Sequence, residues 1–127
     1  MPQLFSVRLK NEPGALADLA QALAEHGIDI RTSSGGGVGN IGWATLSTNN
    51  DDAARDVLRR RRYSFSEGEV LTISVEDQPG SLARLMRRLA DADVNVLGLV
   101  TMGRRQGKAE LALAVDAIDK ARRVLTS

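Results

Sequence analysis

The chain alternates apolar and polar residues in two separated stretches, residues 5–9 and 71–75. This is the period of a β-strand with one buried face. After each stretch a Pro-Gly pair follows, and the apolar spacing then changes to three and four residues. That is the period of an amphipathic helix. The pattern therefore predicts a strand, a Pro-Gly turn and a helix in each half, with the helices crossing residues 16–24 and 82–90.

The same order of elements continues along each half. Gly27 is a natural end for the first helix, and β-branched or alternating runs then indicate a pair of strands before a second helix. The expected elements are second strands over about 28–33 and 94–101, third strands over 41–47 and 108–115, second helices over 50–58 and 116–125, and a fourth strand over 63–67. The order β-α-β-β-α-β predicts a ferredoxin-like α+β fold, with helices on one face of antiparallel sheets.

The two halves are related in sequence. At a shift of 66, residues 11–19 fall on 77–85, and at a shift of 67, residues 54–58 fall on 121–125. This indicates a duplication, with domains 1–67 and 68–127. The second copy has no room for a last strand before the chain ends, and an unfilled sheet edge favours association with another chain or with the other copy.

Composition narrows the chemistry. The chain has 127 residues, 43% hydrophobic and 26% charged, which is typical of a globular protein. It has no cysteine and a single histidine, His26, so a thiolate nucleophile, a disulfide framework and a Cys or multi-His metal site are excluded. We therefore expect no metal and no cofactor. A net charge of +1 and 3% aromatic residues argue against a nucleic-acid binder.

The N-terminus enters strand-like alternation at once, without the apolar core of a signal peptide. No apolar run approaches the length of a membrane span. The sequence therefore predicts a cytoplasmic protein with no membrane partner.

The two Pro-Gly turns carry a family resemblance. Asn11-Glu12-Pro13-Gly14-Ala15-Leu16 (the first elbow) and Asp77-Gln78-Pro79-Gly80-Ser81-Leu82 (the second elbow) each lie between a strand and an amphipathic helix. Asp/Asn-x-Pro-Gly-x-Leu in this setting resembles the ACT-domain family. The resemblance covers nearly the whole chain and is to small stand-alone tandem ACT proteins of bacteria.

The resemblance implies two ferredoxin-like ACT repeats, allosteric regulation by a bound amino acid, and a homodimer. In this family the ligand lies where the first strand turns into the first helix, next to the second strand of a neighbouring ACT domain. Carried over by position, the candidate ligand-binding residues are Asn11, Glu12, Pro13, Gly14, Ala15, Leu16, Ile30, Thr32, Asp77, Gln78, Pro79, Gly80, Ser81, Leu82, Val96 and Gly98.

The chemistry of the elbows points the same way. Glycine at the first helical turn lets a ligand approach the backbone, and the free N–H groups there suit a carboxylate. Asn11 and Asp77 are able to accept hydrogen bonds from an ammonium group, and because only Asp77 is charged the two sites are expected to differ in affinity. The alternative is that Asn11 and Asp77 cap the helices, with Pro just inside each helix start. Both interpretations stay open from sequence alone.

Other motifs have plainer interpretations. Gly37-Val38-Gly39-Asn40-Ile41-Gly42 has the G-x-G-x-x-G spacing of a dinucleotide site, but a strand rather than a helix follows it. We expect a hairpin loop over 33–37 instead. The run Arg59–Arg62 ends a helix, as the helix dipole favours, and is expected to be solvated or to face a partner. We expect His26 to bond helix-terminal carbonyls and Trp43 to lie on the sheet face opposite the helices.

Function follows from what remains. No nucleophile and base are recognisable by their spacing, so we do not expect an enzyme. The favoured hypothesis is a regulatory module that senses an amino acid at the elbows. The alternative is a regulatory subunit that docks onto an enzyme or a transporter and binds little or no ligand.

Overall fold

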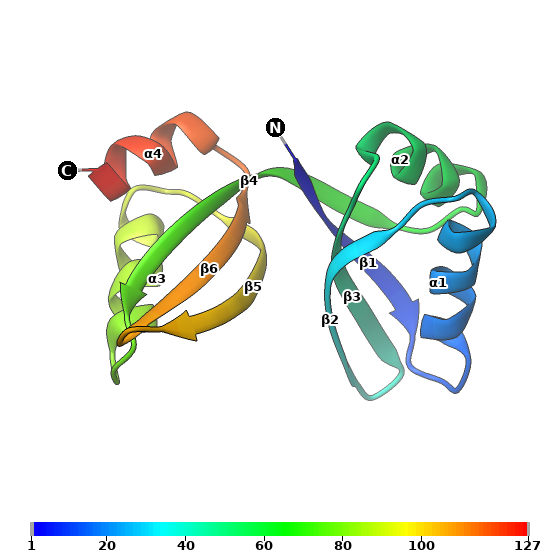
Figure 1. Ribbon diagram of the computed structural model, residues 1–127, viewed down its shortest axis with the longest axis horizontal. Coiled ribbons are helices and arrows are strands. Elements are labelled where there is room, and N and C mark those ends of the chain that lie inside the picture. Colours follow the sequence, from blue (N-terminus) through cyan, green and yellow to red (C-terminus); the bar gives the residue numbers. More distant parts are fainter. Residues whose placement is uncertain (1, 127) are drawn as a thin grey trace. The chain divides into compact units, whose positions relative to one another are not determined.

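The computed structural model describes residues 2–126. The chain divides into two compact units, Pro2–Glu67 and the residues from Gly68 onward. We describe each unit separately. Each combines an antiparallel sheet with two helices (Figure 1), which confirms the predicted α+β class.

The first unit has the order β-α-β-β-α-β. Its elements are β1 (Gln3–Lys10), α1 (Ala15–Glu25), β2 (Ile30–Val38), β3 (Ile41–Thr48), α2 (Asp51–Arg60) and the start of β4 (Phe65–Glu76). The strands lie in the order β2-β3-β1-β4, and β3 is antiparallel to both β1 and β2. This is the ferredoxin-like arrangement.

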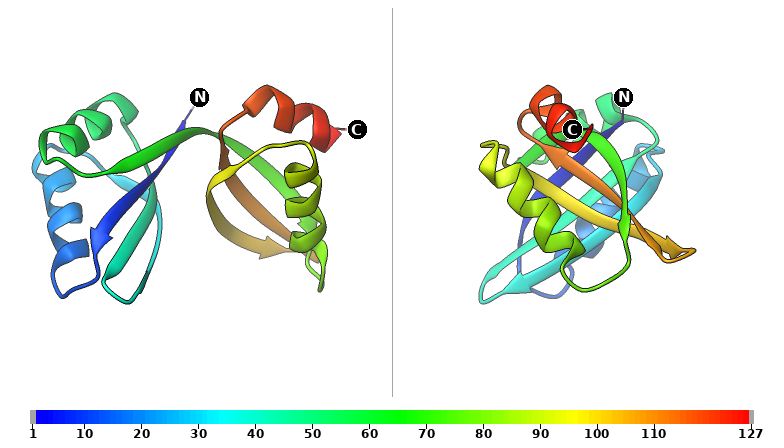
Figure 2. Two further views of the ribbon diagram at one scale, coloured as in Figure 1. Left: turned by 180° about the vertical axis from the view of Figure 1, so that it is seen from behind. Right: turned by 90° about the vertical axis from the view of Figure 1, so that its left-hand side faces the viewer.

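The core of the first unit lies between its sheet and its two helices, which cover one sheet face (Figure 2). The strands contribute every second residue and the helices contribute their apolar stripes, as the alternation predicts. The buried cluster consists of Phe5, Val7, Leu19, Ala22, Leu23, Ile28, Ala44, Leu46, Ala54, Val57 and Leu58.

The second unit contains the rest of β4, followed by α3 (Ser81–Asp91), β5 (Val96–Arg105), β6 (Lys108–Val115) and α4 (Ile118–Thr126). Strand β6 lies between β4 and β5 and is antiparallel to both. The two helices again cover one sheet face. The buried cluster there consists of Leu85, Leu89, Val94, Leu111, Leu113, Val115 and Ala121.

Three expectations about strands were wrong. The predicted fourth strand over 63–67 does not end before Gly68, because β4 runs as one strand from Phe65 to Glu76. The glycines of the expected 33–37 loop belong to β2, and the hairpin turn is only Gly39-Asn40. Strand β5 ends at Arg105 rather than near residue 101. In each case cross-strand hydrogen bonds extend a strand through residues of weak strand propensity.

Several local predictions were confirmed. The Nδ1 atom of His26 lies 3.0 Å from the carbonyl oxygen of Ala22 at the end of α1. The helix predicted from residue 50 is α2, and Asn50 stands at its N-cap, where it accepts a hydrogen bond from the backbone N–H of Ala53 at 3.1 Å. Trp43 lies opposite the buried neighbour Ala44 on β3 and is 44% exposed.

Candidate functional site

The first elbow is a tight turn closed by glycine. The backbone N–H of Ala15 donates to the Glu12 carbonyl oxygen at 3.3 Å, and Gly14 has φ 90° and ψ −14°. This combination is that of a type II β-turn, which requires a positive φ at its third residue. The Gly14 carbonyl oxygen then accepts the first helical hydrogen bond, from Asp18 N–H at 2.8 Å. Gly14 is therefore the residue at the N-cap position of α1.

The second elbow repeats this geometry. Gly80 has φ 91° and ψ −15°, and Ser81 N–H donates to the Gln78 carbonyl oxygen at 3.3 Å. Both elbows are also tied to a neighbouring hairpin: Asn11 N–H donates to Asn40 O at 3.2 Å, and Asp77 N–H donates to Gly107 O at 2.9 Å. The elbow is thus a defined structural unit in both halves.

The capping interpretation of the elbows is wrong. Neither α1 nor α3 has a side-chain cap, and each Pro lies before its helix rather than inside it. Asn11 instead donates from Nδ2 to the Gly39 carbonyl oxygen at 2.9 Å, and Asp77 accepts from Arg104 Nε at 3.1 Å. The residue before each type II turn thus bonds the neighbouring hairpin and does not cap the helix.

Gly14→Ala is expected to lower the free energy of unfolding by about 1–2 kcal/mol, because a Cβ disfavours the left-handed conformation. Space is not the reason, since a Cβ built on Gly14 would have no neighbour within 4 Å. Gly14→Asn is the control and should cost less, because asparagine tolerates positive φ. Urea unfolding measures both, and an alanine variant as stable as the wild type would contradict the turn assignment.

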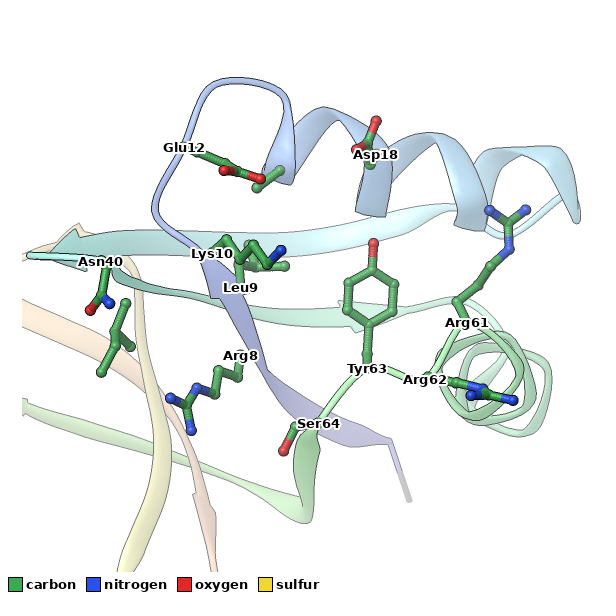
Figure 3. Close-up of a pocket in the computed structure, with 12 residues that line it drawn as sticks. Arg8, Leu9, Lys10, Glu12, Asp18, Asn40, Arg61, Arg62, Tyr63 and Ser64 are labelled. Carbon is green, nitrogen blue, oxygen red and sulfur yellow. The ribbon is translucent and has the colours of Figure 1, made fainter.

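The first groove is a cavity of about 750 Å³ beside the first elbow. It lies under the start of α1, along the edge of β1, and the segment between α2 and β4 closes it (Figure 3). The side chains of Lys10 and Tyr63 point into it, and Glu12 lies at its rim. The lining residues are Arg8, Leu9, Lys10, Glu12, Ala15, Asp18, Asn40, Ile41, Arg61, Arg62, Tyr63 and Ser64.

Most of the charged side chains that line the first groove have no hydrogen-bond or ion-pair partner among residues 2–126. Among residues 2–126, the side chains of Arg8, Lys10, Glu12 and Asp18 make no hydrogen bond and no ion pair. Arg61 instead pairs with Glu25 through Nη2 and Oε2 at 3.1 Å. The groove therefore presents two cations from β1 and two carboxylates from the elbow and α1.

Tyr63 is the titratable group that the groove perturbs. Partial burial raises the pKa of its phenol above the ordinary value, Asp18 raises it further, and Arg61 opposes the rise. The phenol is therefore neutral at physiological pH and is able to donate a hydrogen bond into the groove.

The titration of Tyr63 is directly measurable because the chain has one tyrosine. Ultraviolet absorbance of the phenolate should give a titration midpoint above about 10 in the folded protein. The stability that the raised pKa contributes is present below the unfolded pKa and is lost as the pH rises through the folded pKa. Asp18→Asn should lower the midpoint and Arg61→Gln should raise it. An unchanged midpoint in both variants would show that neither side chain acts on the phenol.

The apolar slot is a smaller cavity of about 310 Å³ between α1 and the β2–β3 hairpin. Leu16 and Ile30 line it together with Ser33, Ser34 and other small or aliphatic residues. No charged side chain lines it, so it cannot pair with both the carboxylate and the ammonium group of an amino acid.

At the second elbow two cavities are smaller and their carboxylates are in ion pairs. The second-elbow pocket, of about 140 Å³, contains the Asp77–Arg104 ion pair. The second groove, of about 450 Å³, lies where the first groove lies in the other unit. Its Glu76 pairs with Lys108 Nζ at 2.9 Å. Arg84 covers the elbow, since a Cβ on Gly80 would meet Arg84 Nη1 at 2.8 Å.

The structure thus separates the residues that the sequence grouped. Glu12 and Ala15 line the first groove, Leu16 and Ile30 line the apolar slot, and Asp77, Gln78, Ser81 and Leu82 line the second-elbow pocket. The residues that line none of these four cavities are Asn11, Pro13, Gly14, Thr32, Pro79, Gly80, Val96 and Gly98. Thr32 is instead bonded to Ser47 through their hydroxyl oxygens, 2.6 Å apart.

Sequence reasoning missed the residues that make the first groove polar: Arg8, Lys10, Asp18 and Tyr63. The polar alternation of β1 marked Arg8 and Lys10 only as outward-facing. One sequence signal for their role was that the strand holding Arg8 and Lys10 contains no acidic residue to pair with them.

The described residues contain neither a metal-binding cluster nor a membrane-spanning helix. Within residues 2–126 no cluster of three or more His, Asp or Glu side chains is placed to hold a metal ion. None of the helices in that range combines the length and the apolar character needed to span a bilayer.

The sheet order β2-β3-β1-β4 and the first elbow with the groove beside it define a ferredoxin-like α+β protein. Residues 4–61, which lie in the first unit, match the family model of the ACT domain, and this confirms the family resemblance of that unit. A comparison with curated proteins finds no significant match.

Solved structures show the same fold over nearly the whole chain. Protein BT0572 from Bacteroides thetaiotaomicron superposes with a TM-score of 0.69 at 21% identity, over 98% of this chain and 85% of that one. The regulatory subunit of aspartate kinase gives TM-scores of 0.67 for the Thermus flavus protein, at 18% identity, and 0.61 for the ligand-free Thermus thermophilus protein, at 16%. Both matches cover 98% of this chain and 90% of the subunit.

Proposed function

We propose that this protein is a non-catalytic regulatory module that senses an amino acid at its first elbow. The observation that carries the proposal is the elbow itself: left-handed Gly14 starts α1 in open space, beside a groove lined with uncommitted charges of both signs. The first N–H group of α1 that donates a helical hydrogen bond is that of Asp18. The N–H groups of Leu16 and Ala17, which come before it in the first turn, are therefore available to a carboxylate.

The proposed mechanism is linkage between binding and conformation. A ligand that bridges β1 and α1 stabilises the conformation in which these elements are held together. It shifts the equilibrium only by its differential affinity for the two states. The likeness to regulatory subunits of aspartate kinase supports a regulatory output, on an enzyme or a transporter.

We also propose that residues 68–127 form a second ACT repeat and that the chain forms a homodimer. The support for the repeat is the near-identical elbow, with φ 90° at Gly14 and 91° at Gly80. The support for the dimer is that β5 is an edge strand whose neighbour in the sheet order is β6 alone among the described residues, since an unpaired strand edge favours pairing with another chain. Light scattering on the purified protein tests the dimer, and a monomer at micromolar concentration would reject it.

A thermal-shift screen against the twenty amino acids tests sensing. A ligand that binds only the folded protein, at about 100 times its dissociation constant, adds about 2.7 kcal/mol, which moves the melting temperature by several degrees. We expect at least one amino acid to do so, and glycerol and inorganic salts at equal concentration to serve as controls. A flat screen on folded protein would reject amino-acid sensing.

Docking without a ligand is the second candidate function. The β2–β3 hairpin exposes three large apolar side chains, Val38 at 72%, Ile41 at 46% and Trp43 at 44%. Exposed apolar side chains that lie together commonly mark a protein interface. If the screen is flat, affinity capture with the wild type and with Trp43→Ser tests this candidate, and a partner lost only from the variant would support it.

A further inference from the structure

Resting on the proposed function, we infer that the amino acid binds once per chain, in the first groove, with its carboxylate on Lys10 and its ammonium group on Glu12 or Asp18. The second groove does not bind it. The inference depends on a comparison of the two grooves, residue by residue, at the sequence shift of 66.

The corresponding grooves carry opposite charges at matching positions. Lys10 of the first groove corresponds to Glu76 of the second, and Asp18 corresponds to Arg84. A cation on the strand and an anion on the helix are therefore replaced by an anion on the strand and a cation on the helix. A ligand oriented by the first groove meets reversed charges in the second.

The charges also differ in whether they are already paired. Across the β4–β6 pair Glu76 faces Lys108, whose Nζ lies 2.9 Å from Glu76 Oε1. Across the β1–β3 pair Lys10 faces Ile41, which offers no partner. Arg84 Nη2 lies 3.4 Å from Ser81 Oγ, whereas Asp18 makes no hydrogen bond through its carboxylate within residues 2–126. The strand charge of the first groove is therefore free to pair with a ligand, whereas the strand charge of the second groove is already paired.

The open edge of β1 supplies a backbone donor in addition. Arg8 N–H donates to Ser64 O at 2.8 Å, on the side of β4. Asn11 N–H donates to Asn40 O, on the side of β3. Because successive residues of a strand direct their N–H groups to alternate sides, Lys10 N–H faces the same side as Arg8 N–H, beyond the point where β4 begins at Phe65. A carboxylate there meets both the backbone and the ammonium group of Lys10.

The charged side chains of the first groove suit the zwitterion of an amino acid. Lys10 is available to the carboxylate, and Glu12 and Asp18 are available to the ammonium group. Arg8, Arg61 and Arg62 also line the groove, with Arg61 paired to Glu25. In Figure 3 the side chains of Arg61 and Arg62 turn away from Lys10. The phenol of Tyr63 and the amide of Asn40 suit a polar, uncharged side chain.

Isothermal titration of the full chain with neutral, acidic and basic amino acids tests the inference. We expect about one site per chain and weaker binding as salt rises. Two equal sites would overturn the inference while leaving amino-acid sensing intact. Binding of no amino acid would overturn the proposed function as well.

A charge transplant identifies the groove. The double variant Lys10→Glu with Asp18→Arg gives the first groove the charges of the second and should weaken binding by about tenfold or more, which corresponds to about 1.4 kcal/mol. The matched control is Glu76→Lys with Arg84→Asp, which should leave the affinity within about twofold. Circular dichroism confirms that each variant is folded. Equal losses in both, or a loss only in the control, would overturn the assignment.

A single substitution gives an independent test. Ile41→Glu places a carboxylate opposite Lys10, just as Lys108 lies opposite Glu76. Because this carboxylate occupies the ammonium group of Lys10, the variant should weaken binding about three- to tenfold. Ile41→Gln is the control of equal size without the charge. If both variants bind equally well, Lys10 is not a ligand contact.

Discussion

Replacing Leu23 with alanine is expected to lower the free energy of unfolding by about 2–5 kcal/mol. Leu23 lies on α1, is fully buried, and belongs to the core cluster of the first unit. The loss has two parts, the transfer free energy of the removed atoms and the cavity that rigid neighbours on β1 and β3 leave unfilled. The fluorescence of Trp43, the single tryptophan, reports unfolding of this unit.

Two further substitutions test whether the cavity causes the loss in the free energy of unfolding. Leu23→Met keeps the volume and should cost less than about 1.5 kcal/mol. Leu89→Ala makes the equivalent change on α3, where Leu89 is also fully buried, and should cost a similar amount in a far-ultraviolet circular dichroism transition. A Leu23→Ala variant within about 1 kcal/mol of the wild type would show that the core under α1 is not closely packed.

Sequence periodicity was sufficient where one face of an element is buried. The spacing of apolar residues after each Pro-Gly pair places Leu23 and Leu89 at the same position of their helices, and both are buried. The third strand predicted over 108–115 is β6 without a shift. These elements follow from local patterns because the period itself reports which face meets the core.

Periodicity failed where a tertiary contact decides the outcome. Gly68 looks like a break between strands, but in β4 it packs against Val115, and an added Cβ would lie 3.0 Å from the Val115 carbonyl oxygen. Glycine there permits close packing of strands rather than a turn. Likewise Gly36 and Gly37 lie within β2, where added Cβ atoms would meet the side chains of Trp43 and Asn11. A single sequence does not distinguish these uses of glycine.

The candidate site was predictable only in part, for the same reason. The Pro-Gly motif located the elbow and two lining residues of the first groove, Glu12 and Ala15. Tyr63 reaches the groove from a segment about fifty residues along the chain, and the importance of Lys10 depends on the apolar residue opposite it, Ile41. Whether a charge is paired depends on cross-strand register, which the pattern of one strand does not contain.

A bidentate ion pair joins α2 to β4. Arg55 bonds both oxygens of the Glu67 carboxylate, with Nε at 2.6 Å and Nη2 at 2.8 Å, and each side chain is only 24% exposed. The hydrogen bonds with Glu67 raise the pKa of the Arg55 guanidinium further above its ordinary value, so the pair is charged wherever Glu67 is ionised. Arg55→Met should therefore cost about 1.5–3 kcal/mol in urea unfolding, since it leaves a half-buried carboxylate without its two donors.

The chain provides controls for that experiment. Asp52 also bonds Arg55, at 2.8 Å, but its side chain is 95% exposed, so Asp52→Asn should cost less than about 1 kcal/mol. The double variant Arg55→Met with Glu67→Met completes a double-mutant cycle. It should be more stable than Arg55→Met alone, because no unpaired carboxylate remains. If the double variant is instead as unstable as the sum of the single variants, the two side chains stabilise the unit through separate contacts. The bidentate pair would then contribute no coupling energy between α2 and β4.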